Sequence, residues 1–304
     1  MPRIKPDSKV KYTLLKEMTS RFGNTYNKHN YLRAWYQFGT DISSSGNLPD
    51  LATTSAVYPT NLAPVSDPAD RPAAPISDFP AGPSAPGDFP TKSARFSDDV
   101  ISAGTDKFNF GDGSNDSPFS ISVWFKLDSL GSGKQVIVAK SDSTDPSSGS
   151  KKQFVLQVDE STAKVQFFLF DQSAGGSRRA QSSTAIQSDR WYHVVATYSG
   201  TSSKVYVDGV DDTTYSQVGS YTAMENKNIK FSVGNLIPES SSSDFKGLLA
   251  QIAFWDTVLS SEDALALFEL KDGAAVRESG FLNLPPRLEI RSRDNTTGSY
   301  PTIL

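Results

Sequence analysis

The sequence predicts an all-β protein whose strands form an antiparallel sandwich or jelly roll. FSISVWFKL at 119–127 alternates large apolar residues with Ser, Trp and Lys, which is the period of a β-strand. RWYHVVATYSGTSSKVYVDG at 190–209 has two apolar runs separated by a polar turn and ends in Asp-Gly, a strong hairpin signal. The bulky residues of 191–198 fall on both faces, so we expect this strand to be covered on both sides.

The first zone, residues 1–40, is basic and aromatic. It holds eight Lys or Arg residues against Asp7 and Glu17, a net charge of +6, and the rest of the chain carries about −10. Residues 30–38 are compatible with a short helix or with a strand. Docking of this zone onto a protein partner and binding to nucleic acid both fit its composition, and the acidic remainder favours a protein partner.

The second zone, residues 41–90, contains ten of the 18 prolines. Proline lacks the amide donor that helices and sheet ladders use, so we expect an extended path without either structure. In a polyproline-like conformation this segment spans on the order of 100 Å.

The third zone, about 91–280, contains the predicted sandwich. Ser260-Ser-Glu-Asp263 has the pattern of a helix capping box, and the apolar positions after it predict one short helix. Residues 281–304 form a tail with no clear packing face. The other short runs that we expect to be strands lie at 135–140, 153–158, 164–170, 229–233 and 248–255.

The whole-chain composition excludes several function classes. The net charge of −4 disfavours nucleic acid as the main partner, and zero cysteines exclude disulfides and Cys-ligated zinc. The first 20 residues lack the apolar core of a signal peptide and no later run is long enough to cross a bilayer, so we expect folding in a cytoplasm.

At three places the sequence resembles the concanavalin A-like, laminin-G-like jelly-roll domains. These places are FNFGDGSNDSPFSISVWFKL (108–127), the hairpin at 190–209 and FKGLLAQIAFWDTVLSSEDALALFEL (245–270). The resemblance implies a sandwich of two curved antiparallel sheets over about 91–270. It also implies binding to carbohydrate or protein surfaces. The proline spacing predicts an extended N-terminal arm before the sandwich. Ala250-Gln251 stands where many relatives have Asp-Glu, which puts any calcium or loop-anchoring role of that pair in doubt.

The sequence gives only weak signs of any known arrangement of catalytic residues, so we expect no enzyme activity. The chain has eight glutamates, none in the Glu-x-Asp-x-x-Glu pattern that sandwich glycosidases place on a strand. The histidines are His29 and His193, and His193 lies inside a predicted strand beside Trp191, where a packed core histidine is more common than a catalytic one. No serine nucleophile elbow or phosphate-binding glycine loop is present.

The candidate binding residues fall into three groups. Aspartates in loops fit either calcium or ordinary turns, and strand aromatics fit either a ligand platform or a second buried layer. The basic aromatic start supplies partner-anchoring candidates. These groups are Asp98, Asp112 and Asp116 for a metal; Trp124, Phe168 and Phe170 for a ligand; and Arg21, Tyr26, Tyr31, Arg33, Trp35 and Tyr36 for a partner.

A lectin-like module without a secretion signal fits the surface of a virus particle, which is assembled inside the host cytoplasm. The functional hypothesis is therefore a structural bacteriophage virion protein, capsid-decorating or tail-associated. Residues 1–90 would bind other virion proteins, and the sandwich would bind host-surface glycans, with homo-oligomerisation plausible. The alternatives are a non-viral carbohydrate-binding or adhesion module and, third, a glycan-degrading enzyme.

Overall fold

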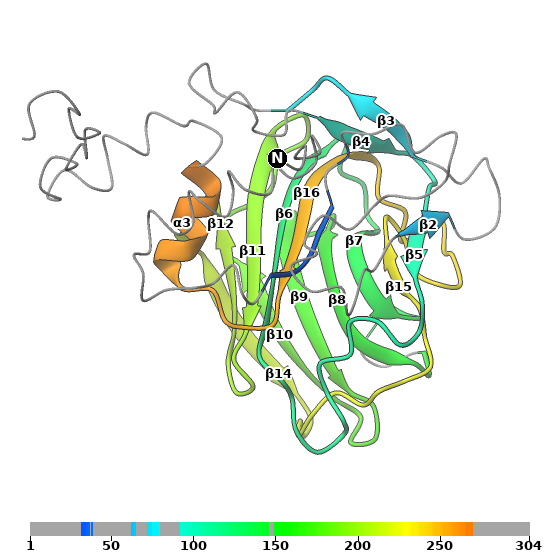
Figure 1. The fold of residues 1–304 in the computed structure, drawn as a ribbon, viewed down its shortest axis with the longest axis vertical. Coiled ribbons are helices and arrows are strands. Elements are labelled where there is room, and N and C mark those ends of the chain that lie inside the picture. The colour runs from blue at the N-terminus through cyan, green and yellow to red at the C-terminus, as the bar shows by residue number, and fades with distance from the viewer. Residues whose placement is uncertain are drawn as a thin grey trace, which may run out of the picture.

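The computed structural model describes residues 32–36, 38, 62–64, 72–79, 92–145 and 149–269. Two antiparallel sheets pack face to face with one short helix, which confirms the predicted sandwich (Figure 1). No helix in these ranges is long and apolar enough to cross a membrane.

The first sheet places strands that are distant in sequence side by side. Its central strands are β6 and β16, which pair through Leu249–Phe125 and Phe254–Ile121. The order along the sheet is β13 (Val210–Asp211), β12 (Ser203–Val207), β11 (Trp191–Tyr198), β6 (Phe119–Leu127), β16 (Gly247–Trp255), β4 (Ser93–Phe96) and β3 (Ala73–Ile76), with β1 (Leu32–Tyr36) also paired to β16.

The second sheet is built largely from consecutive hairpins. Its order is β14 (Thr213–Val218), β10 (Gly176–Ser182), β9 (Lys164–Asp171), β8 (Lys152–Asp159), β7 (Lys134–Ser141), β15 (Phe231–Val233), β5 (Ile101–Ala103) and β2 (Ala63–Pro64).

The core between the sheets consists of the apolar halves of the alternating strands. Phe119 of β6 stacks on Phe110 with ring centroids 4.0 Å apart and meets Phe167 of β9 edge-on at 5.8 Å. Leu156 and Val158 of β8 complete the same fully buried cluster. Strand β11 is buried along its length apart from Trp191, as its two-sided apolar pattern predicts.

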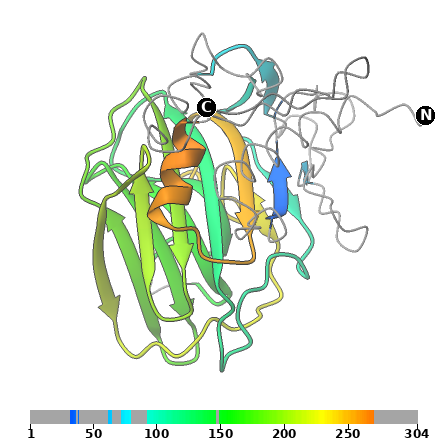
Figure 2. The same cartoon turned by 60° about the vertical axis from the view of Figure 1, so that its left-hand side comes forward.

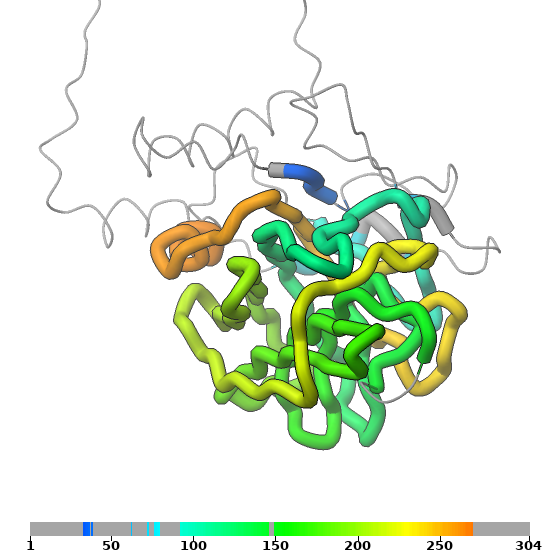
Figure 3. Tube along the Cα trace, turned by 90° about the horizontal axis from the view of Figure 1, so that it is seen from below, coloured from blue at the N-terminus to red at the C-terminus, as the bar shows by residue number. Residues whose placement is uncertain are grey.

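Helix α3 (Ser261–Glu269) begins at the predicted capping box. The Ser260 amide donates to Asp263 Oδ2 at 2.7 Å, and the Asp263 amide donates to Ser260 Oγ at 3.2 Å. The helix packs on the outer face of the first sheet, where the Phe268 ring stacks on Trp124 at 5.7 Å. Figures 1 and 2 show the helix at the β11–β12 side of the first sheet, and Figure 3 shows α3 and β1 on the same side of the sandwich.

Strand β1 corrects the prediction that Arg33, Trp35 and Tyr36 are held out for a partner. Trp35 and Tyr36 are 2% and 0% exposed, and the strand pairs with β16 from Leu32–Trp255 to Tyr36–Ile252. Arg33 Nη1 forms an ion pair with Asp256 at 2.9 Å. The aromatic residues of β1 are therefore part of the sandwich's own core, and of the two alternatives for residues 30–38 the strand is confirmed.

The proline-rich zone also departs from its prediction, because β2 and β3 do enter sheet ladders. Strand β3 contains Pro75 and pairs with β4 through Ala73–Arg95 and Ile76–Ser93, with an irregularity between these two pairs. Proline is tolerated at sheet edges, since an edge strand uses only one side of its backbone for pairing. Arg21, Tyr26, Tyr31 and the tail at 281–304 lie outside the described residues.

Candidate functional site

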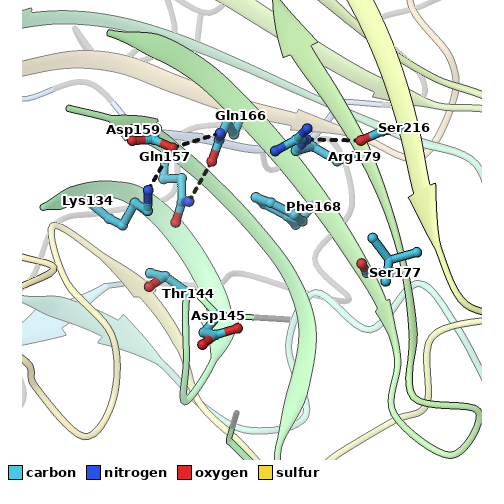
Figure 4. A pocket seen from close by; sticks show the side chains of 11 residues that line it. Lys134, Thr144, Asp145, Gln157, Asp159, Gln166, Phe168, Ser177, Arg179 and Ser216 are labelled. Atoms are coloured by element: carbon cyan, nitrogen blue, oxygen red, sulfur yellow. Dashed lines mark hydrogen bonds and ion pairs between the residues drawn. The ribbon is translucent and has the colours of Figure 1, made fainter. Parts of the chain in front are cut away.

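A pocket of about 450 Å³ lies on the outer face of the second sheet (Figure 4). Strand alternation places it there: Leu156 and Phe167 face the core, while their neighbours Gln157 and Phe168 face outward. The floor comes from β7, β8, β9, β10 and β14, and the loop after β7 borders one side. Its lining residues are Lys134, Thr144, Asp145, Gln157, Asp159, Gln166, Phe168, Ser177, Arg179, Ser216 and Val218.

A directed chain of hydrogen bonds orders the polar side of the pocket. Lys134 Nζ lies 2.6 Å from Asp159 Oδ2, and Gln166 Nε2 donates to the same oxygen at 3.0 Å. Gln166 Nε2 also donates to Gln181 Oε1 at 2.9 Å, and Gln157 Nε2 donates to Gln166 Oε1 at 3.0 Å. Because a carboxylate can only accept, Asp159 sets the direction of every amide in the chain.

The last atom of this chain is a buried acceptor without a donor. Gln157 is 0% exposed, and its Oε1 accepts no hydrogen bond from the described residues. Figure 4 shows the Gln157 amide projecting between Lys134 and Phe168. Leaving a buried acceptor unsatisfied costs about 1–3 kcal/mol, so any O–H or N–H group that reaches this atom, from water or from a ligand, is favoured.

Burial and hydrogen bonding shift the pKa of the Asp159 carboxyl in opposite directions. Burial raises the pKa of the Asp159 carboxyl, but the hydrogen bonds from Lys134 and Ser161 outweigh it and hold that pKa below its usual value. Asp159 is therefore a carboxylate at neutral pH, and the direction of the amide chain is fixed under those conditions.

The aromatic side of the pocket is a row of rings between two cations. The rings of Phe168 and Phe170 are parallel within 3° at a centroid distance of 5.6 Å. Arg179 lies 5.8 Å from the Phe168 centroid, and Lys152 lies 5.2 Å from that of Phe170. Arg179 Nε donates to Ser216 Oγ at 3.0 Å, and among the described residues no carboxylate lies within ion-pair distance of this guanidinium.

The three predicted ligand-binding aromatics are not brought together. Phe168 lines the pocket, and Phe170 lies behind it, packed in a small cluster with Val155 and Leu236. Trp124 is on the outer face of the other sheet and is 2% exposed, because Phe79 and Phe268 cover it. The alternative of a second buried layer therefore describes Trp124, and it also fits Phe168 and Phe170, which are 6% and 1% exposed and share one buried cluster. Of the three, only Phe168 also lines the pocket.

The three predicted metal aspartates do not converge either. Asp112 accepts the amides of Ser114 and Asn115, as a turn aspartate does. Asp116 accepts from the Tyr221 hydroxyl at 2.6 Å and the Met224 amide at 2.8 Å, while burial raises its pKa.

The third aspartate, Asp98, is exposed and lies near Asp244. Within the described ranges no three acidic or histidine side chains form a metal-binding group.

His193 occupies a packed position. It is 1% exposed, its Nε2 lies 2.8 Å from Ser122 Oγ, and its ring lies 4.9 Å from that of Trp124. Nothing about this position exposes the imidazole to a substrate.

Sequence reasoning missed most of the pocket. Gln157 and Gln166 lie on predicted strands, where their alternation with apolar residues was the available signal of a polar outer face, and Asp159 directly follows the first of these predicted strands. Arg179 lies on β10, whose sequence GSRRAQS lacks the apolar alternation by which strands were recognised.

Comparison with known proteins agrees with this architecture. The family model described as the concanavalin A-like lectin/glucanases superfamily matches residues 102–264, more than half of the 304 residues. A search of curated proteins returns no match.

Solved structures with a similar fold include two from botulinum neurotoxins. One is of neurotoxin type C, whose uptake into cells depends on interaction with two ganglioside molecules; it is 14% identical, with a TM-score of 0.53 over 82% of this chain and 53% of that one. The receptor binding domain of neurotoxin D is 12% identical, with a TM-score of 0.52 over 79% and 53% of the two chains.

A Trypanosoma rangeli sialidase in complex with 2,3-difluorosialic acid is 12% identical, with a TM-score of 0.47 over 79% of this chain and 33% of that chain. The chain therefore spans between 33% and 53% of the length of these structures. Identities at this level show a shared fold only. The family match over more than half of the chain shows that the protein belongs to the concanavalin A-like lectin/glucanases superfamily.

Proposed function

We propose that this protein is a carbohydrate-binding module and that the pocket on the outer face of the second sheet holds the glycan. The observation that supports this most directly is the Phe168 ring beside a fixed row of amides that ends in the unsatisfied Gln157 Oε1. Pockets of about 300–1,000 Å³ with an apolar surface and a few fixed polar groups are typical of small-ligand sites.

The chemistry of the two sides matches the two kinds of surface on a sugar ring. The C–H face of a pyranose is apolar and packs on an aromatic ring, which Phe168 offers between Arg179 and the second ring, Phe170. The ring hydroxyls need fixed donors and acceptors, and Gln157 supplies an acceptor whose direction is set by Gln166 and Asp159. Arg179 adds donors suited to a hydroxyl or a carboxylate of the glycan.

The family supplies further support at the level of fold. Lectins give the superfamily part of its name, and botulinum neurotoxin type C, which shares the fold, interacts with gangliosides. We propose binding without catalysis and without a required metal ion, so calcium remains an outcome of the binding test.

The test is a bacterial and animal glycan array followed by calorimetry on the best ligand. Gln157→Leu removes the acceptor but keeps the volume, and Phe168→Leu removes the flat ring but keeps apolar bulk. We expect each change to weaken binding about 3–10-fold or more, the equivalent of one lost hydrogen bond or stacking contact.

Gln217→Ala is the matched control, because Gln217 lies on β14 next to Ser216 but does not line the pocket. No binding to any glycan, or binding that both pocket variants leave unchanged, would refute the site. Loss of binding in EDTA would assign a role to calcium, and release of reducing sugar would establish an enzyme.

For the setting of this function we propose a bacteriophage virion, with a non-viral adhesion module as the alternative. Support comes from composition: residues 1–31 contain seven Lys or Arg residues against two acidic ones, and a proline-rich stretch follows at 41–90. Since β1 belongs to the sandwich, attachment would use the residues before it. Mass spectrometry of purified particles tests the location, and a chain lacking residues 1–31 should keep glycan binding while losing particle attachment.

A further inference from the structure

The segment that follows β3 is held across the outer face of the first sheet by side chains from several strands. Two hydrogen bonds hold the segment next to the start of β4. Ser93 Oγ donates to the Asp78 carbonyl at 2.7 Å, and Lys92 Nζ donates to the side-chain oxygen of Ser77, Oγ, at 2.6 Å. These contacts place Asp78 and Phe79 over β6 and β11, although β4 and β16 lie between β6 and the edge strand β3.

The Asp78 carboxylate is bound at both of its oxygens. Lys126 Nζ lies 2.7 Å from Oδ2, and Trp191 Nε1 donates to Oδ1 at 3.0 Å. Burial raises the pKa of Asp78, but these two hydrogen bonds outweigh it and the pKa is lowered. The hydrogen bond to Asp78 raises the pKa of Lys126 in return. This is a charge-assisted arrangement suited to a carboxylate.

The Phe79 ring packs between two tryptophans, and we name its position between them the groove. Its centroid lies 5.3 Å from Trp124 and 5.5 Å from Trp191, with interplanar angles of 71° and 63°. Edge-to-face contacts at such distances are favourable by about 0.5–1.5 kcal/mol each beyond burial. Phe268 of α3 stacks on Trp124 and fixes the groove. Donors that bind a carboxylate lie beside an aromatic groove here, which is the geometry of a peptide-binding site specific for Asp-Phe.

The same three residues occur again ten positions later. Asp78-Phe79-Pro80 follows Ser77, and Asp88-Phe89-Pro90 follows Gly87. Phe79 and Phe89 are the only two of the 18 phenylalanines that precede a proline, and both follow an aspartate.

We propose that this groove, formed by Lys126, Trp124 and Trp191, is a recognition site for the sequence Asp-Phe-Pro, and that residues 88–90 are its second ligand. The site's backbone anchor, Ser93, is five residues after Asp88, a separation that an extended chain spans up to about 17 Å. The Asp78 carbonyl is 2.7 Å from Ser93 Oγ, so the position that it occupies is within reach of Asp88.

Exchange of the two ligands changes the length of the arm. With residues 88–90 bound, residues 77–79 leave the groove, and the Ile76–Ser93 pairing of β3 with β4 is lost. The stretch of chain that precedes the bound residues then becomes ten residues longer, which is on the order of 30 Å in an extended conformation. The groove thereby acts as a two-position clamp on the segment that precedes the sandwich.

The experiment measures binding of two synthetic peptides, PISDFPAG and APGDFPTK, by fluorescence of the groove tryptophans. In the full chain carrying Phe79→Ala and Phe89→Ala together, the groove has no ligand of its own. We expect both peptides to bind this double variant saturably and at least ten-fold more tightly than Phe79→Ala alone, in which Phe89 competes. Peptides with Asn in place of Asp should bind at least ten-fold more weakly, because the carboxylate contacts are lost.

Failure of both peptides to bind the folded double variant would overturn the recognition site. Equal peptide affinity of Phe79→Ala and the double variant would overturn residues 88–90 as the second ligand. If the double variant does not fold, Phe79→Leu with Phe89→Leu replaces it, since leucine keeps apolar bulk but loses the edge-to-face contacts with the two tryptophans. The same comparison is made against Phe79→Leu alone, with the same two outcomes.

Discussion

Replacement of Tyr36 by alanine should destabilise the whole sandwich, although this residue lies more than 50 positions before the predicted start of the domain. Tyr36 is 0% exposed and belongs to the core cluster between the sheets, together with Ala34 and Phe38. Truncating a fully buried aromatic residue to alanine costs about 3–5 kcal/mol through lost burial and the cavity left behind. Since domains have about 5–15 kcal/mol of stability in total, the loss is a large fraction of it.

Urea unfolding followed by tryptophan fluorescence measures this change as a lower midpoint at unchanged slope. Asp256→Asn is the control, because it removes only the half-exposed ion pair with Arg33, for which about 0–1 kcal/mol is expected. A chain beginning at residue 91 should unfold at much lower urea than the full chain, since it lacks all of β1. An unchanged midpoint in both Tyr36→Ala and that shortened chain would refute the assignment of β1 to the core.

Three further changes test single features of the fold. Burial and the nearby Asp98 raise the pKa of Asp244 to about 6, so the free energy of unfolding should fall by on the order of 1–2 kcal/mol from pH 4 to 6. Urea titrations at each pH measure this slope, and Asp244→Asn should abolish it. Burial lowers the pKa of Lys140 to about 8, so stability should rise between pH 8 and 10.5 in the parent protein but not in Lys140→Met. Gly209→Ala should cost about 1–2 kcal/mol or more in thermal unfolding, because its φ is +82° and a Cβ would lie 2.9 Å from the Leu265 Cα.

The strands that sequence alone predicts well are those buried on at least one regular face. FSISVWFKL and the hairpin at 190–209 became β6, β11 and β12 with the expected bounds to within one or two residues. Their alternation is strong because every second side chain faces the core between the sheets. The capping box at Ser260 was equally readable, since it depends only on local contacts.

The elements that sequence alone missed depend on distant partners. GSRRAQS has no apolar face and becomes β10 because β9 on one side and β14 on the other supply its backbone partners. The segment AAPI becomes β3 only because β4 presents a free edge. The pocket was missed for the same reason, because its eleven lining residues come from five strands and one loop.

The two outer faces of the sandwich differ in what covers them, and the proposed roles of the two faces rest on this difference. On the first sheet, Trp124 and Trp191 would make a good aromatic platform, but Phe79 and Phe268 of the same chain already occupy it. On the second sheet, the Phe168 side of β9 borders a cavity, and the amide chain beside it ends in an acceptor that no described residue satisfies. On the second sheet a ligand from outside would therefore meet an unsatisfied acceptor beside an open cavity, while binding at Trp124 and Trp191 on the first sheet requires displacement of the chain's own Asp-Phe segment.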